Sequence, residues 1–125
     1  MIVLDASALL AFLFGETGHE QVASHLDSSC ISSVNLSEVI GRFTRDGHDA
    51  SEVLQRINQS AIKTVPFLAE DAALAAALVP ATLSLGLSLG DRACLALAAS
   101  RKAPAWTADR TWAALDIGLK IEIIR

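Results

Sequence analysis

The stretch that decides the fold is "MIVLDASALLAFLFGE" (residues 1–16), in which an aspartate interrupts an apolar run. Ile2–Leu4 predicts a short buried strand, and residues 6–14 predict a short apolar helix that ends at Gly15. Asp5 therefore stands at the junction between a strand and a helix. A carboxylate within such an apolar run needs a reason, because burying an unpaired charge is costly.

The rest of the chain alternates apolar strands with helical segments. Further strands are expected at residues 28–33, 62–67, 104–109 and 120–125. Helices are expected at residues 17–26, 35–47, 49–61 and 69–79, from just after Ser88 through residue 102, and at 110–115, with Pro80 closing the fourth of them and a loop at 81–90. This alternation predicts an α/β fold, a three-layer α/β/α sandwich with a mainly parallel central sheet. The length favours one domain spanning residues 1–125.

The composition is that of a folded protein. Hydrophobic residues make up 52%, charged residues 19%, and the mean hydropathy is +0.43, which together argue against disorder. Cys30 and Cys94 lie far apart in apolar surroundings, as expected for buried thiols in a reducing compartment. Residues 6–14 are too few to span a membrane and follow no basic segment. We therefore expect a soluble, cytoplasmic protein with no membrane segment.

Three more acidic residues occupy places that resemble that of Asp5. Glu38 is expected in the first turn of the helix after the second strand, and Asp91 in the first turn of the helix that starts near Ser88. Asp109 follows the apolar residues 105–107 and precedes the next helix. All four acids are thus expected close to points where a strand gives way to a helix.

Helix capping explains each of these acids taken singly. Asn35 with Glu38, and Ser88 with Asp91, match the capping-box pattern. The other two acids have the position of N-cap residues, and acids near helix N-termini are favourable in any case. Capping does not by itself explain why four acids recur in this way.

A parallel sheet would bring the four acids together, because its strands end at one edge, where ligand sites form. Two carboxylates about 4 Å apart repel by about 4 kcal/mol at an effective dielectric near 20. A divalent cation removes that repulsion. The ligands would all be hard oxygens, without His or Cys, which favours Mg²⁺ or Mn²⁺ over zinc. Such ions suit phosphodiester hydrolysis, because they activate a bound water and neutralise phosphate charge.

The net charge of −4 does not favour electrostatic binding of nucleic acid. Without the four site acids, however, the fourteen acidic residues fall to ten and equal the ten basic ones. The candidate contacts to a nucleic-acid backbone are Arg42, Arg45, Arg92 and Arg110. Each is also explained as a solvated side chain or a partner of a neighbouring acid.

Four segments, spread over nearly the whole chain, together resemble a known family. They are "MIVLDASALLAFLFGE", "NLSEVIGR" with Glu38, "LSLGDRACLALA" with Asp91, and "WTADRTWAALDIGLKIEIIR". Their order and content are similar to those of PIN domains, and in particular of the small toxin ribonucleases of VapBC toxin–antitoxin pairs.

The resemblance implies a PIN-like fold and Mg²⁺- or Mn²⁺-dependent endoribonuclease activity. The positions that match the family's four acids are Asp5, Glu38, Asp91 and Asp109. Asp5 and Asp91 are the firmest expected metal contacts, while the other two bind directly or through water. Ser7 and Thr107 match hydroxyl positions of the family and are expected to orient these carboxylates, although hydroxyls at helix starts are commonly just caps.

The resemblance also implies partners: an RNA substrate, a VapB-type antitoxin and a second copy of the chain in a homodimer. Three other hypotheses stay open. A catalytically silent module would bind RNA or antitoxin without turnover. A phosphoacceptor receiver-like domain would want a lysine after the last-but-one strand, whereas Lys102 precedes it. A phosphatase with an Asp-x-Asp nucleophile is disfavoured because position 7 is Ser.

Overall fold

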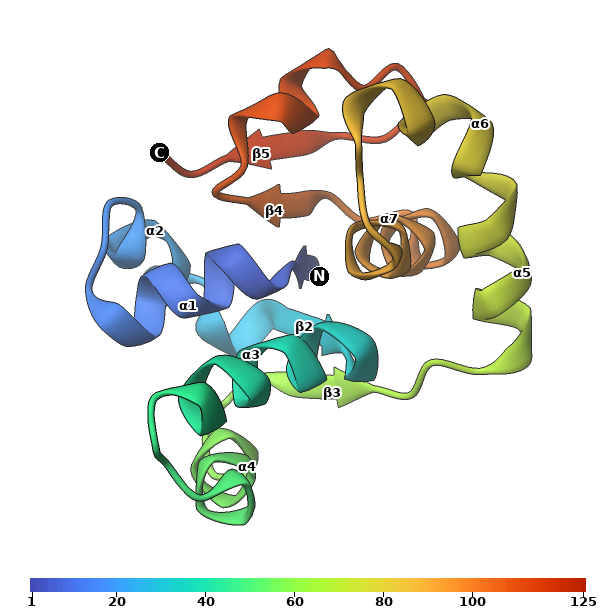
Figure 1. Ribbon diagram of the computed structural model, residues 1–125. Helices are drawn as coiled ribbons and strands as arrows, with labels where there is room; N and C mark the ends of the chain where they lie inside the picture. Colours follow the sequence, from blue (N-terminus) through green and yellow to red (C-terminus); the bar gives the residue numbers. More distant parts are fainter.

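A five-stranded parallel sheet forms the centre of the computed structural model, which describes residues 1–125 (Figure 1). Its strands are β1 (Ile2–Leu4), β2 (Ser29–Ser32), β3 (Lys63–Val65), β4 (Ala105–Thr107) and β5 (Ile121–Ile123). They lie in the order β3-β2-β1-β4-β5, and every pairing is parallel. The predicted α/β architecture with a parallel central sheet is confirmed.

Helices cover both faces of this sheet. The helices are α1 (Ala6–Phe14), α2 (His19–Ser24), α3 (Ser33–Arg45), α4 (Ala50–Asn58), α5 (Ala69–Ala77), α6 (Val79–Thr82) and α7 (Leu89–Arg101), with 3₁₀ turns η1 (Leu26–Ser28), η2 (Leu83–Leu85) and η3 (Arg110–Ala114). Strand side chains alternate between the two faces. Val3 packs with residues of α7, whereas Leu4 packs with residues of α1 and α2 on the opposite face.

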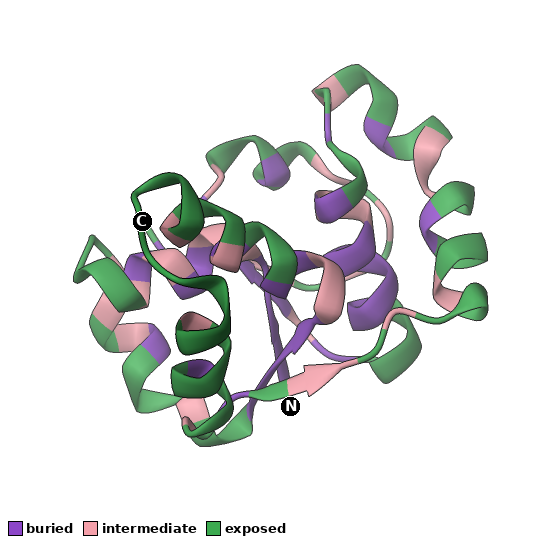
Figure 2. Ribbon diagram, turned by 60° about the horizontal axis from the view of Figure 1, so that its bottom comes forward, coloured by how far each residue is buried: buried purple, intermediate pink, exposed green.

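Helix α7 is the buried helix of the fold (Figure 2). Residues 93–98, "ACLALA", are all buried, and three of the six are alanines. Small side chains let the helix approach the sheet closely, and they allow it to contact β1, β2 and β4 at once. The first turn of α7 consequently lies near the carboxyl ends of the central strands, where it also meets α3.

The structure corrects the expected loop at residues 81–90. Pro80 does not simply end a helix but sits in the first turn of α6, where the missing N–H of proline is tolerated. The 3₁₀ turn η2 follows directly, and Gly86 ends it with a positive φ of 66°. None of the helices has the length and apolar character needed to cross a bilayer.

Candidate functional site

The strand order places a topological switch point beside β1. The chain leaves β1 towards β2 on one side, while β4 pairs with β1 on the other. Ligands of doubly wound sheets bind in the crevice outside the carboxyl ends of the strands at such a point. Asp5 is the first residue after β1, and its backbone N–H donates to the carbonyl oxygen of Trp106 at 3.0 Å. Asp5 therefore stands at this crevice.

The carboxylate of Asp5 is held by three donors from two elements. Oδ1 accepts from the Ser7 hydroxyl at 2.7 Å and from the Ala8 backbone N–H at 2.8 Å, so Asp5 is the N-cap of α1 as expected. Oδ2 accepts from the Thr107 hydroxyl at 2.5 Å. Ser7 and Thr107 thus contact the acid that they were predicted to orient.

Burial dominates the electrostatics of Asp5. The residue is only 3% exposed, and burial raises the pKa of its carboxyl from 3.8 to about 6. The hydrogen bonds from Thr107, Ala8 and Ser7 act in the opposite direction, and the nearby Asp91 carboxylate raises the pKa further. A carboxylate kept in this environment gains strongly from a cation.

Asp91 occupies the first turn of α7, as predicted. Ser88 is the N-cap, and the two residues form the predicted capping box. The Asp91 backbone N–H donates to the Ser88 hydroxyl at 3.2 Å, and Oδ2 of Asp91 accepts from the Ser88 backbone N–H at 2.8 Å. Oδ1 of Asp91 has no hydrogen bond within the protein, so capping uses only half of this carboxylate.

Glu38 departs from the expected arrangement. Helix α3 begins at Ser33, with Ser32 as its N-cap, so Glu38 lies beyond the first turn and Asn35 caps nothing. The predicted capping box of Asn35 and Glu38 is wrong, because the N-cap is Ser32, three residues before Asn35. Instead, Nδ2 of Asn35 donates to Oε1 of Glu38 at 2.9 Å and to the backbone carbonyl of Gly90 at 2.9 Å.

Asp109 is the N-cap of the 3₁₀ turn η3, as expected. Its Oδ1 accepts from the Thr111 backbone N–H at 3.0 Å and the Thr111 hydroxyl at 2.8 Å, and Oδ2 has no hydrogen bond. The Asp109 backbone N–H donates to the Thr107 hydroxyl at 3.0 Å, and Thr107 in turn contacts Asp5. The fourth acid is therefore connected to the first through one threonine.

A buried thiol shows which acids share a neighbourhood. Burial raises the pKa of Cys94 well above its ordinary value, and the negative charges of Asp5, Asp91 and Glu38 raise it further. Cys94 is fully buried in α7 and belongs to the core on the α7 face of the sheet. Three of the four predicted acids thus act on one thiol, and Asp109 adjoins them through Thr107.

No three His, Cys, Asp or Glu side chains lie close enough together to hold a metal ion by themselves, so a bound ion would use fewer protein ligands together with water. Glu38, Asp91 and Asp109 each have one carboxylate oxygen bonded to the protein and one without a hydrogen bond. Oxygen-only donors suit Mg²⁺ or Mn²⁺, which keep several waters and take few protein ligands. These residues could hold such an ion.

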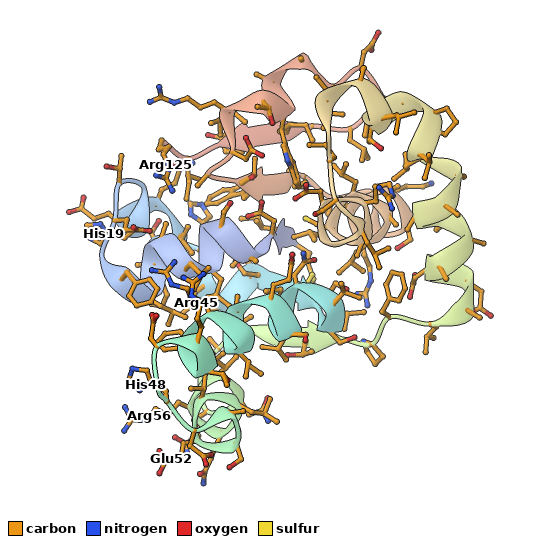
Figure 3. The ribbon with its side chains drawn as sticks, viewed as in Figure 1. His19, Arg45, His48, Glu52, Arg56 and Arg125 are labelled. Atoms are coloured by element: carbon orange, nitrogen blue, oxygen red, sulfur yellow. The ribbon has the colours of Figure 1, made fainter.

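The four arginines considered as nucleic-acid contacts do not form one group. Arg42 and Arg45 are near Asp46, with Nε to carboxylate distances of 3.4 and 3.9 Å. Arg45 lies seven residues, or about 10 Å of helix, beyond Glu38, at the end of α3 seen in Figure 3. Nη1 of Arg92 donates to the carbonyl of Leu87 at 3.1 Å, and Arg110 is exposed. A role in RNA binding stays a prediction for all four.

Sequence reasoning missed Asn35 and Gly90 as parts of this site. The side chain of Asn35 is 1% exposed, and its Oδ1 is buried with no partner. A Cβ added at Gly90 would overlap the carboxylate of Glu38. A glycine directly before an acid in the first turn of a helix was the available signal, because glycine disfavours helix and needs a local reason there.

The fold and this edge define a doubly wound α/β domain with acidic side chains at its switch point. The PIN domain family model matches residues 2–118, and the chain belongs to this family. The predicted membership of the PIN family is confirmed. No curated protein matches the sequence.

Solved structures show the same fold. One chain of "VapBC2 from Rickettsia felis bound to a DNA fragment from their promoter" superposes with a TM-score of 0.75 at 17% identity, covering 100% of both chains. VapC20 of Mycobacterium tuberculosis, described as a "Sarcin-Ricin loop cleaving toxin", gives 0.74 at 19% identity, covering 96% of this chain and 99% of the other. VapBC-5 of the same organism gives 0.60 at 25% identity, covering 98% and 96%.

Proposed function

We propose that this protein is a Mg²⁺- or Mn²⁺-dependent endoribonuclease and the toxin of a type II toxin–antitoxin pair, acting in the cytoplasm as one domain of residues 1–125. The observation that carries the proposal is the buried Asp5 carboxylate at the switch point, beside the first turn of α7, where Asp91 follows Gly90 and the Glu38 carboxylate lies against Gly90. Membership of the PIN family and the likeness to VapBC structures support a metal-using nuclease.

The residues of this chain would divide the chemistry among them. A bound divalent ion would supply a water of lowered pKa and charge neutralisation at the phosphate. Asp5, fixed by three donors, cannot turn away from the crevice and would be the most rigid contact to the ion. Asp91, Glu38 and Asp109 would offer their free oxygens, directly or through water.

A VapB-type antitoxin is the proposed protein partner. A pocket of about 340 Å³ opens between α1, α3 and α4, with Leu13, Phe43, Val53 and Ile57 as its apolar lining. Leu13 and Phe14 are 39% and 41% exposed. Apolar side chains left exposed beside a pocket support binding of an amphipathic segment. VapBC-5, one of the structures with this fold, is described as a member of a family of toxin–antitoxin systems.

A homodimer is the proposed assembly. Four leucines between the start of α5 and the start of α7 stay strongly exposed: Leu68, Leu74, Leu83 and Leu89. These side chains would add apolar area to such an interface. The molar mass in solution, measured by light scattering, tests this.

The decisive experiment is RNA cleavage by the purified chain, with Mg²⁺ or Mn²⁺ and with chelator. We expect cleavage by the wild type only with metal, and its loss in Asp5→Asn and Asp91→Asn. Glu70→Gln, an exposed acid in the first turn of α5, is the matched control and should cleave normally. A wild type that folds and binds RNA but never cuts it would favour the silent binding module instead.

A further inference from the structure

Two elements on opposite faces of the sheet meet at Glu38. This residue belongs to α3, whereas Gly90 and Asp91 belong to the first turn of α7. The amide of Asn35 joins the two helices, because its Nδ2 donates at 2.9 Å both to Oε1 of Glu38 and to the carbonyl of Gly90. Each hydrogen of this amide thus has its own acceptor, and one acceptor is the candidate site acid.

Gly90 contributes from the other side. The carboxylate of Glu38 occupies the space into which a Cβ at position 90 would project, with both its oxygens and its Cδ in contact there. Only glycine leaves that space open. The Glu38 carboxylate therefore lies between the Asn35 amide, which donates to it, and the backbone of Gly90, which precedes Asp91.

The amide of Asn35 is poorly explained by packing. The residue is 1% exposed, and its Oδ1 is buried without a partner, which costs free energy that an apolar side chain would not. Glu38, by contrast, is exposed and has no other protein hydrogen bond to fix its conformation. A glutamate side chain without a hydrogen bond would lose rotamer freedom when it binds an ion. The hydrogen bond from Asn35 already restricts Glu38, so the entropy cost of binding an ion is smaller.

We propose that Asn35 and Gly90 together position Glu38 for the divalent ion: the carboxamide holds Oε1 while the missing Cβ of Gly90 leaves the carboxylate its place beside Asp91. The inference rests on the proposed metal-dependent function and assigns this chain's positioning residues for it. Asn35 does not touch the ion or the substrate. It acts through Glu38, so its contribution disappears once the Glu38 carboxylate is gone.

The test compares Gly90→Ala with Gly41→Ala. Both replace a helical glycine by the best helix former, but a Cβ at Gly41 meets nothing within 4 Å whereas one at Gly90 meets Glu38. Mn²⁺ affinity of the purified protein is measured by calorimetry, and thermal unfolding is followed in chelator. We expect Gly90→Ala and Asn35→Ala to weaken Mn²⁺ binding about tenfold or more, and Gly41→Ala to leave it unchanged.

The second arm repeats Asn35→Ala and Gly90→Ala in a Glu38→Ala background. We expect neither to weaken Mn²⁺ binding further there, because no carboxylate remains to be positioned. We expect the melting temperature of Gly90→Ala in chelator to equal or exceed that of the wild type. A lower melting temperature would indicate that Gly90 has a purely structural role. Restoring the amide as Asn35→Gln is expected to recover part of the lost affinity.

The outcomes separate the two proposals. If the wild type binds Mn²⁺ but Gly90→Ala and Asn35→Ala bind it equally well, the positioning inference is overturned and the proposed function stands. If the two variants still weaken binding in the Glu38→Ala background, Glu38 is not the residue they act through, and the inference is overturned as well. If the folded wild type binds neither Mn²⁺ nor Mg²⁺, the proposed function falls and takes the inference with it.

Discussion

The acids at the carboxyl edge of the sheet fall into two halves, a strand half with Asp5 and a helix half with Glu38 and Asp91, which differ in burial and hydrogen bonding. On the strand side, Asp5 is buried, and three donors from α1 and β4 engage both of its oxygens. On the helix side, Glu38 is exposed, Asp91 is half-buried, and each gives only one oxygen to the protein. The strand half thus fixes a charge at a cost in stability, whereas the helix half keeps oxygens free at little cost.

The largest expected effect contrasts one acid from each half. Asp5→Asn should lower metal-dependent RNA cleavage more than about 100-fold, since even residues behind metal ligands cost 10- to 100-fold. Glu38→Gln should lower it less, because its side chain is exposed and held by one bond. Single-turnover cleavage at saturating protein measures both. An Asp5→Asn variant as active as the wild type would remove Asp5 from the proposed metal site.

The second prediction uses the pH dependence of folding without metal. Because the carboxyl pKa of Asp5 is about 6 when folded and about 3.8 when unfolded, the folded protein binds more protons between these values. The contribution of the Asp5 carboxyl to stability is full below about pH 4 and is lost as the pH rises to about 6. At about 1.4 kcal/mol per unit of pKa shift, this loss amounts to about 3 kcal/mol. Urea unfolding in chelator at several pH values measures this.

Asp5→Asn is the control for that measurement, because it retains the N-cap and removes the titration. The difference in unfolding free energy between the two proteins should grow from pH 4 to pH 6 in favour of Asp5→Asn. Glu38→Gln should change the free energy of unfolding by less than about 0.5 kcal/mol at any pH. A constant difference across this range would mean that Asp5 titrates normally.

A third prediction compares two threonines that both donate to an acid. Thr107→Val removes the buried donor to Asp5 and the acceptor of the Asp109 N–H, and should cost about 2 kcal/mol at pH 7.5. Thr111→Val removes an exposed donor to Asp109 and should cost less than about 0.5 kcal/mol. Chemical denaturation in chelator gives both values. Equal costs would contradict the distinction between a buried and an exposed acid.

The smallest expected effect lies outside both halves. Arg42 pairs with Asp46 and lies over the ring of Phe14, at 5.0 Å from its centroid, but the ion pair is exposed. Arg42→Ala should therefore change stability by less than about 1 kcal/mol. If Arg42 contacts RNA, the salt dependence of binding, measured with uncleavable RNA, should become shallower in the variant. An unchanged slope would remove Arg42 from the candidate RNA contacts.

The strand half was the predictable one. An aspartate after three apolar residues and before an apolar helix has few structural meanings, and parallel strands bring their carboxyl ends to one edge. The pattern "SLGD" likewise indicated the capping box of Ser88 and Asp91, which the structure contains. Local patterns of this kind depend only on nearby residues.

Within the helix half, the surroundings of Glu38 depended on long-range contacts that no local pattern encodes. The sequence "NLSE" matches a capping box, but Ser32 is the better-placed cap, which moves the start of α3 and turns Asn35 towards α7. Likewise, Pro80 suggested an end to helical structure, whereas α6 begins around it. Which of two competing starts a helix uses is decided by what its side chains meet in space, 55 residues away in the case of Asn35.

The reactivity of the buried Cys94 thiol can report how often the protein opens. Thiol reagents attack the thiolate, and burial together with three negative neighbours keeps that form scarce in the closed molecule. Alkylation of Cys94 would therefore require an opening of the protein that exposes this buried residue. The rate of labelling, followed by mass spectrometry, would measure how often the protein opens. Binding of a divalent ion at the acids should lower this rate.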